Sequence, residues 1–183
     1  MDYTESFSED VVDNFVGMYA KGLTPNPCVE CNRSVKFDHF LTQAKKLNCE
    51  KVATGHYAKI IKNDNNYELH KADYLDKDQS YVLHMLTSEK LEYIEFPLGT
   101  ISKPEVRQIA AELGLKTAFK KDSQDICFVG KKDYRNFVNT RVDISSSGEI
   151  VDNNGKKIGE HKGVHGFTAV SYTHLTLPTI AIV

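Results

Sequence analysis

Three stretches of the chain carry apolar residues at the spacing of a helix with one buried face. The first follows Ser8, a good N-cap residue, and stops at Gly22. The second stops at Asn48, and the third opens with the capping box Ser102-x-x-Glu105. The positions predicted to face the core are Val12, Phe15, Val16 and Tyr19 in the first helix, Phe37, Phe40, Leu41 and Ala44 in the second, and Val106, Ile109, Ala110 and Leu113, before Gly114, in the third.

Short apolar runs bounded by turn residues predict strands between these helices. Residues 51–54 indicate a buried strand that ends at Gly55-His56. One hairpin is predicted from 56–61 and 67–71, and another from 148–151 and 156–158 around an Asn-Gly turn. The run 126–129 is either a strand or a loop edge. Two shorter helices are predicted, one from about Ser80 to Leu86 and one that begins at Asp133.

This alternation of helices and short strands predicts an α/β fold with helices on a mostly parallel sheet. The pattern changes near Thr140, so we expect a domain boundary there. Residues 1–140 then belong to the parallel-sheet domain, and residues 141–168 form the start of a small β-containing domain. Residues 169–183 contain no Lys, Arg, Asp or Glu and are interpreted as a foreign tail.

Composition is typical of a globular protein outside the membrane, with 40% apolar and 26% charged residues. No apolar run is long enough to span a bilayer, and no signal peptide opens the chain, so we expect a cytoplasmic protein with no membrane partner. The formal net charge of −2 gives no support for a nucleic-acid partner, which would need local basic patches.

Four cysteines without a secretory signal favour metal, cluster or catalytic sulfur over a disulfide framework. Cys28 and Cys31 have C-x-x-C spacing and follow Pro25-Asn26-Pro27, which predicts a stiff extended loop. Arg33 and Lys36 add positive charge where a helix begins, and both features favour a thiolate. The alternatives for these cysteines and Cys127 are a zinc knuckle or inert buried thiols. Cys49 is predicted to be a buried structural cysteine.

The run from Gly22 to Phe37 resembles the tRNA-specific 2-thiouridylases, a family that places sulfur on the wobble uridine of tRNA. The resemblance extends in one order from about Phe7 to Thr168. Its further motifs are Ala53-Thr54-Gly55-His56-Tyr57-Ala58, Lys77-Asp78-Gln79-Ser80-Tyr81, Phe96-Pro97-Leu98-Gly99, Lys121-Asp122-Ser123-Gln124-Asp125-Ile126-Cys127-Phe128 and Gly159-Glu160-His161.

The resemblance implies an adenine-nucleotide alpha-hydrolase-like (PP-loop ATPase) fold and ATP-dependent 2-thiolation of uridine 34 of tRNA. In that reaction the base is adenylated, and sulfur then comes from a cysteine persulfide. Cys127 would carry the persulfide and Cys31 would be the nucleophile, and the two can form a disulfide. ATP, with Mg²⁺, would approach Gly55, and a sulfur-donor protein (a persulfide relay or a cysteine desulfurase) would be a partner. The residues implied to contact tRNA are Asn26, Pro27, Cys28, His56, Lys77, Asp78 and Gln79.

The chain departs from the family pattern at three points. Many members have Asp where this chain has Cys28, and that carboxylate could act as a base. In this chain the base role is then absent or taken by another group, or else Cys28, Cys31 and Cys127 together hold a [4Fe–4S] cluster. We favour the persulfide mechanism over the cluster. The Ser-Gly-Gly-x-Asp-Ser pyrophosphate loop is missing, and the sequence after Thr168 differs. We therefore interpret the chain as an internal fragment and expect it to be inactive alone. The rival hypothesis is a non-catalytic zinc- or RNA-binding module, which metal content would distinguish.

Overall fold

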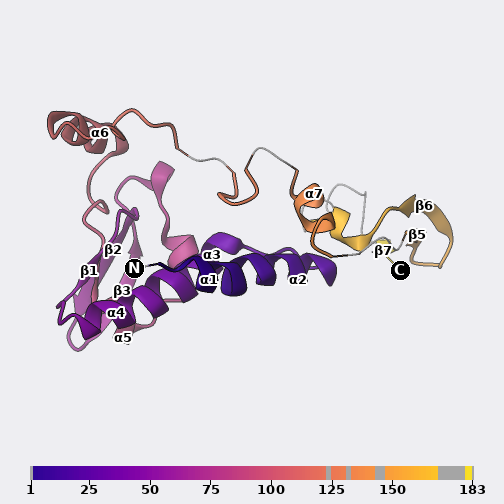
Figure 1. Ribbon diagram of the computed structural model, residues 1–183, viewed down its shortest axis with the longest axis horizontal. Coiled ribbons are helices and arrows are strands. Elements are labelled where there is room, and N and C mark those ends of the chain that lie inside the picture. Colours follow the sequence, from indigo (N-terminus) through magenta and orange to yellow (C-terminus); the bar gives the residue numbers. More distant parts are fainter. Residues whose placement is uncertain (1, 123–124, 131–132, 143–146, 169–179, 183) are drawn as a thin grey trace. The chain divides into compact units, whose positions relative to one another are not determined.

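The polypeptide packs as two compact units in the computed structural model (Figure 1). One unit comprises residues 1–27 and 124–183, and the other comprises residues 28–123. The structure describes residues 2–122, 125–130, 133–142, 147–168 and 180–182. The predicted boundary near Thr140 stays a prediction. Most of the predicted foreign tail, residues 169–179 and 183, lies outside the described residues.

A continuous helix opens the unit of residues 1–27 and 124–183. It consists of α1 (Thr4–Phe7), the π-helical segment η1 (Ser8–Asp13) and α2 (Asn14–Ala20). The predicted N-cap is wrong, because Ser8 has helical angles of φ −63° and ψ −51° inside this helix. The i→i+5 winding of η1 shifts the buried face by one position, so Val11, at 1% exposure, replaces Val12 in the core.

The end of this helix at Gly22 is confirmed. Gly22 has φ +72°, and the Leu23 N–H donates to the Met18 carbonyl at 3.0 Å. This pattern is a Schellman C-cap, in which glycine adopts the left-handed conformation without a Cβ clash.

An aromatic core joins this helix to α7 (Tyr134–Asn139). The rings of Tyr19 and Tyr134 stack at 4.6 Å, and Phe128 meets Phe15 edge-on at 5.3 Å. The predicted start of α7 is confirmed, because the Asp133 carboxylate accepts from the Arg135 N–H at 3.1 Å. The buried side chains of this core are Phe15, Val16, Tyr19, Val129 and Val138.

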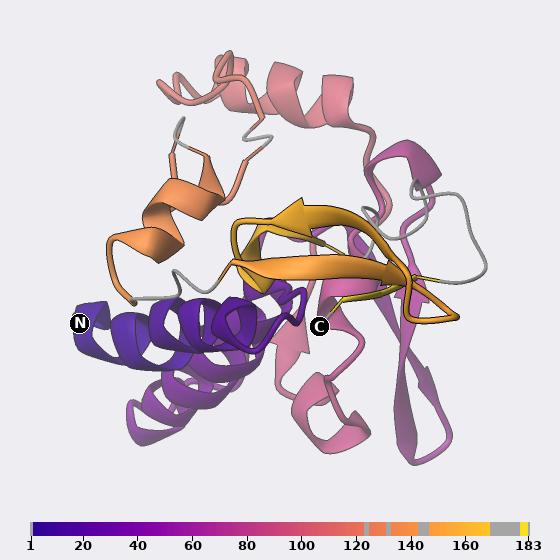
Figure 2. The same cartoon turned by 90° about the vertical axis from the view of Figure 1, so that its right-hand side faces the viewer.

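A three-stranded antiparallel sheet completes this unit, with the order β6-β5-β7 (Figure 2). The predicted hairpin is confirmed as β5 (Gly148–Asp152) and β6 (Lys157–His161). Strand β7 (Ile180–Ile182), within the predicted tail, pairs with the other edge of β5. The short helix η5 (Val164–Gly166) follows β6.

The unit of residues 28–123 begins with a second continuous helix. It consists of α3 (Pro27–Cys31), η2 (Asn32–Phe40) and α4 (Leu41–Lys46). Phe37, Leu41 and Ala44 are buried as predicted, but Phe40 is 39% exposed, because the π-helical winding of η2 turns it outward. The predicted stop is confirmed, since Asn48 has φ 56° and the Cys49 N–H donates to the Ala44 carbonyl at 2.9 Å.

The strands of this unit confirm an α/β fold. β1 (Val52–Ala53) pairs in parallel with β4 (Ile94–Glu95), and β2 (Ala58–Asn63) forms the predicted hairpin with β3 (Asn66–Lys71). The helix predicted from Ser80 to Leu86 is instead the 3₁₀ segment η4 (Ser80–Leu83), preceded by η3 (Leu75–Lys77) and followed by α5 (Ser88–Leu91). The buried core consists of Phe37, Ala58, Leu83, Leu86, Leu91, Ile94 and Phe96.

Gly99, the last residue of the Phe96-Pro97-Leu98-Gly99 motif, lies against the backbone of β2. A Cβ atom on Gly99 would come within 2.0 Å of the Ala58 carbonyl oxygen. The Asp73 N–H donates to the Gly99 carbonyl at 2.9 Å, which holds the residue in this position. Packing alone therefore requires glycine here.

Helix α6 (Lys103–Glu112) has the predicted capping box. The Ser102 hydroxyl accepts from the Glu105 N–H, and the Glu105 carboxylate accepts from the Ser102 N–H. Its predicted core face is wrong. Ile109 is 44% and Leu113 70% exposed, and no residue of α6 is fully buried. The helix lies apart from strand β1 in Figure 1. Within the described ranges, none of the helices reaches the length and hydrophobicity needed to cross a bilayer.

Candidate functional site

The C-x-x-C pair lies on a helix rather than on the loop where we predicted it. Leu23 to Asn26 form neither helix nor strand, and α3 begins immediately afterwards at Pro27. Cys28 is exposed and Cys31 half-buried in its first turns. Because residues three apart share one face of a helix, both thiols point from the same side of α3. Both thiols therefore lie at the start of this helix, next to the segment Leu23 to Asn26.

The side chain of Asn32 ties this helix to the rest of its unit, and further side-chain bonds lie within the helix. Asn32, at 2% exposure, donates from Nδ2 to the Val82 carbonyl at 2.9 Å, and Ser34 donates to the Glu30 carbonyl at 3.0 Å. Arg33 pairs with a residue of the preceding turn, because its Nε donates to the Glu30 carboxylate at 3.1 Å; its predicted influence on the thiols stays a prediction. The Asn32 hydrogen bond thereby anchors the helix one residue beyond Cys31.

His56 lies at the carboxyl end of β1 in an aromatic cage. Phe96 meets the imidazole edge-on at 5.8 Å and Phe37 lies at 6.0 Å, while Thr54 Oγ1 is 2.8 Å from Nδ1. Only 8% of the residue is exposed. Burial, with a smaller contribution from the nearby positive charge of Lys36, lowers the pKa of His56 to about 4. Its imidazole is therefore neutral at physiological pH.

The depressed pKa of His56 predicts a loss of stability in acid. The unfolded chain takes up a proton near the ordinary pKa of 6.5, whereas the folded protein takes it up only near 4. Stability should therefore fall as the pH drops from about 6.5 to about 4, by about 3 kcal/mol from this group. Urea unfolding at pH 7 and pH 4.5 should show a smaller acid loss in His56→Asn than in the unaltered chain. His84→Asn, at an exposed position, is the control and should retain the full loss. Equal acid losses in all three proteins would refute the assignment.

Gly55, one residue before His56, has an open flank. A Cβ atom there would meet only the Leu98 Cδ1 atom, at an ordinary contact distance of 3.7 Å. Packing thus does not require glycine at this position, in contrast to Gly99. A small residue at the end of a parallel strand leaves room for a ligand to approach the backbone.

The Lys77-Asp78-Gln79 motif is bonded within the protein. The Asp78 carboxylate accepts from the Ala72 N–H at 2.7 Å and from the Ser80 hydroxyl at 2.6 Å. Gln79 Oε1 accepts from the Tyr57 N–H at 3.0 Å, and the Gln79 N–H donates to the Tyr57 carbonyl at 2.8 Å. Asp78 and Gln79 therefore fasten this segment to the residues before β2 and after β3, at the open end of the hairpin.

Cys127 is exposed in the other unit, on a turn rather than a strand. The Val129 N–H donates to the Ile126 carbonyl at 3.1 Å to form this turn. Phe128 packs against Phe15, and Val129 is buried, so the two residues after Cys127 anchor the turn in the aromatic core. An exposed thiol on an anchored turn is accessible to a reaction partner.

All four cysteines are described, and each is a thiol outside any disulfide. The Cys31–Cys127 disulfide therefore stays a prediction for the oxidised protein. Cys49 is exposed, which corrects its predicted burial; the helix ends just before it, so its side chain leaves the core. Among the described residues, no three His, Cys, Asp or Glu side chains are grouped to hold a metal ion.

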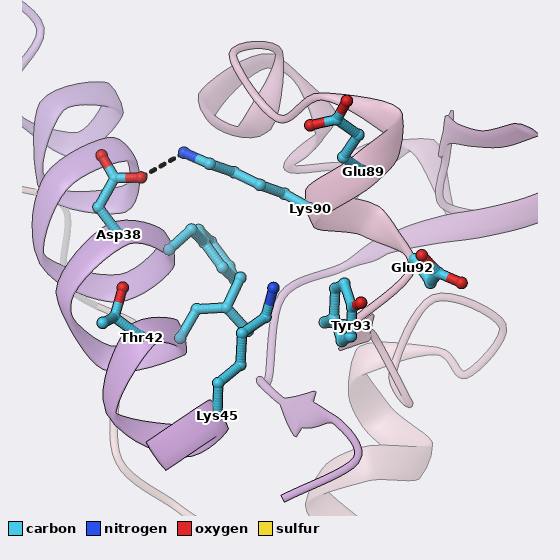
Figure 3. A pocket seen from close by; sticks show the side chains of 9 residues that line it. Asp38, Thr42, Lys45, Glu89, Lys90, Glu92 and Tyr93 are labelled. Atoms are coloured by element: carbon cyan, nitrogen blue, oxygen red, sulfur yellow. Dashed lines mark hydrogen bonds and ion pairs between the residues drawn. The ribbon is translucent and has the colours of Figure 1, made fainter. Parts of the chain in front are cut away.

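A cavity of about 480 Å³ lies between helix η2–α4 and helix α5 (Figure 3). Its charges are largely satisfied within the protein. Lys90 pairs with Asp38 across the cavity, and Lys45 Nζ lies 3.6 Å from the centre of the Tyr93 ring. Because its cations already have partners, this cavity is a weaker candidate for an anionic ligand.

Comparison with known proteins adds independent findings. The family described as the tRNA methyl transferase HUP domain matches residues 1–131. The tRNA-specific 2-thiouridylase MnmA of Rickettsia peacockii (strain Rustic) is 48% identical over 169 residues, which are 92% of this chain and 46% of that protein. Proteins of the same name from Rickettsia akari (strain Hartford) and Rickettsia bellii (strain OSU 85-389) are 47% and 48% identical over the same shares. The chain thus spans about half the length of the curated relatives it matches.

Proposed function

This chain belongs to the family described as the tRNA methyl transferase HUP domain, and 92% of it aligns with tRNA-specific 2-thiouridylases at about 48% identity. We propose that it carries the sulfur-transfer groups for 2-thiolation of uridine 34 of tRNA. The observation that supports this most is the position of Cys31. It is half-buried in the first turns of an anchored helix that follows an extended segment. A thiol held in place on an anchored helix, next to a segment that can meet a substrate, is suited to act as a nucleophile.

Cys127 and Cys31 divide the chemistry between them. Adenylation of the C2 oxygen with ATP makes that oxygen a leaving group, which departs as AMP. The terminal sulfur of a Cys127 persulfide bonds to C2 as AMP leaves. The Cys31 thiolate then attacks Cys127 Sγ, and the bond between this atom and the transferred sulfur breaks. The products are 2-thiouridine and a Cys31–Cys127 disulfide, which an external thiol must reduce before a donor protein loads new sulfur.

The remaining site residues bind the substrates. ATP, accompanied by Mg²⁺, approaches the open flank of Gly55. Asn26, Pro27 and Cys28 receive the target base at the start of α3, and His56 contacts tRNA as a neutral imidazole. Asp78 and Gln79 position the segment from which Lys77 offers its charge to the RNA. The reaction takes place in the cytoplasm, where a persulfide relay or a cysteine desulfurase supplies sulfur.

An iron–sulfur mechanism is the second candidate, and Cys28 favours it. Cys28 and Cys31 lie on one helical face and would supply two ligands of a [4Fe–4S] cluster, for which Cys127 would have to come close as the third. Iron, sulfide and zinc analysis after anaerobic purification separates this candidate from the persulfide mechanism and from a zinc-binding module.

The proposal can be tested in a chimera, since the chain spans 46% of its Rickettsia peacockii relative. The 169 aligned residues of this chain would replace their counterparts in that protein. We expect the purified chimera, given ATP, a sulfur donor and a tRNA transcript, to form 2-thiouridine detectable by nucleoside mass spectrometry. A chimera that folds and binds tRNA but forms no 2-thiouridine would contradict the proposal.

A further inference from the structure

A cavity of about 570 Å³ lies beside helix α6, within the unit of residues 28–123. Its walls include Lys77, Lys103 and Arg107, together with Phe119 and Asp122. These residues come from the motif after β3, from two turns of α6 and from the segment that leads towards Cys127. The fold thus concentrates cationic side chains that are far apart in the sequence.

Three cations share a single carboxylate at this cavity. Asp122 lies 3.2 Å from Lys77 Nζ, 3.1 Å from Lys103 Nζ and 3.8 Å from Arg107 Nη2. Hydrogen bonds from Lys103 and then Lys77 lower the pKa of Asp122, so it remains ionised. With Asp76 at the rim, the lining groups retain one net positive charge.

Arg107 has unused hydrogen-bonding capacity. Its Nη2 is beyond hydrogen-bond distance of Asp122, and its Nε has no partner within the described part of the chain. A guanidinium group has five donors in a fork that matches the oxygens of a phosphate. Asp122 alone therefore leaves Arg107 largely unsatisfied.

Phe119 adds an aromatic surface to the same cavity. It is 82% exposed, the highest fraction among the large exposed apolar residues of the described chain. An aromatic ring beside cations is the combination that binds single-stranded nucleic acid, because bases stack on the ring while phosphates pair with the charges.

We propose that this cavity binds a phosphodiester group of the substrate RNA, which replaces Asp122 as the partner of Lys103, Arg107 and Lys77, while a neighbouring base stacks on Phe119. This inference rests on the proposed function for the identity of the RNA. Asp122 acts as an internal anion that keeps the cations together until RNA binds. It competes with the phosphate, so its removal should strengthen RNA binding.

The test is fluorescence anisotropy with a labelled tRNA transcript and the whole 183-residue chain. Lys103→Gln and Arg107→Gln should each weaken binding about fivefold and reduce the slope of log K against log salt by about one. Asp122→Asn should tighten binding about threefold, and Phe119→Ala should weaken it about fivefold. Lys90→Gln, which removes a similarly exposed cation at the other cavity, should change little.

Two outcomes would overturn the inference. Asp122→Asn could weaken binding, which would mean that Asp122 only maintains the structure. Lys103→Gln could also leave RNA binding nearly unchanged, as expected for the control Lys90→Gln, which would mean that the cavity does not bind the RNA. Thermal unfolding of each variant separates lost contacts from lost folding. An ATP titration shows whether the phosphate belongs to RNA or to ATP. If ATP displaces the RNA from the unaltered chain but not from the Lys103 and Arg107 variants, the cavity binds the nucleotide instead. If the variants behave as expected while the chimera makes no 2-thiouridine, the proposed function fails and this inference stands.

Discussion

Replacing Cys31 by serine in the chimera should reduce 2-thiouridine formation at least about a thousandfold while tRNA binding is unchanged. The reaction needs a thiolate, whereas a serine hydroxyl stays protonated at neutral pH and cannot attack a sulfur–sulfur bond. Cys31 contributes little to the core, since it is half-buried on the helix surface, so folding should survive. Nucleoside mass spectrometry measures the product, and anisotropy measures tRNA binding.

The matched control is Cys49→Ser, which changes an exposed thiol outside every motif and should retain full activity. Cys127→Ser should be as inactive as Cys31→Ser. Cys28→Asp separates the two mechanisms, because it should retain activity if Cys28 only replaces the carboxylate of other family members, and lose it if Cys28 binds iron. An active Cys31→Ser chimera would show that Cys31 is not the nucleophile.

Gly99→Ala should destabilise the chain by about 3 kcal/mol, a severe effect for one methyl group. The added Cβ would stand 2.0 Å from the Ala58 carbonyl oxygen, and the obstacle is backbone rather than a movable side chain. To relieve this clash, the start of β2 must move away from the loop that contains Gly99. That loop is held in place by the hydrogen bond from the Asp73 N–H to the Gly99 carbonyl.

Gly17→Ala is the control for this substitution. Gly17 lies within α2, and a Cβ there meets no atom within 4 Å. Alanine is the better helix former, so this change should stabilise the chain by about 0.5–1 kcal/mol. Urea unfolding of both variants gives the free energies. A loss below about 1 kcal/mol for Gly99→Ala would mean that the motif tolerates a side chain.

Local chemistry made the C-terminal ends of the helices and the hairpins predictable. Gly22, Asn48 and Gly114 each adopt a positive φ at the predicted end of a helix, because that conformation depends mainly on the residue itself. The buried faces were less predictable. The π-helical segments shift Val12 and Phe40 out of the positions that a regular 3.6-residue period gives them.

The candidate site could be predicted only in part, because much of it depends on contacts between distant residues. The sequence places Gly55-His56 after a strand, but the cage around His56 is formed by Phe37 and Phe96. Likewise, nothing in the sequence near Lys77 indicates that Asp122 forms ion pairs both with Lys77 and with two cations of α6, Lys103 and Arg107.

The central claim is that Cys127 donates sulfur and Cys31 releases it, and one turnover without reductant tests this most directly. The chimera, with Cys127 loaded as a persulfide, would react with ATP and tRNA, and its peptides would be mapped by mass spectrometry beside the nucleosides. We predict one Cys31–Cys127 disulfide for each 2-thiouridine formed. A dominant Cys28–Cys31 disulfide, or 2-thiouridine formed while all four cysteines remain thiols, would contradict this account.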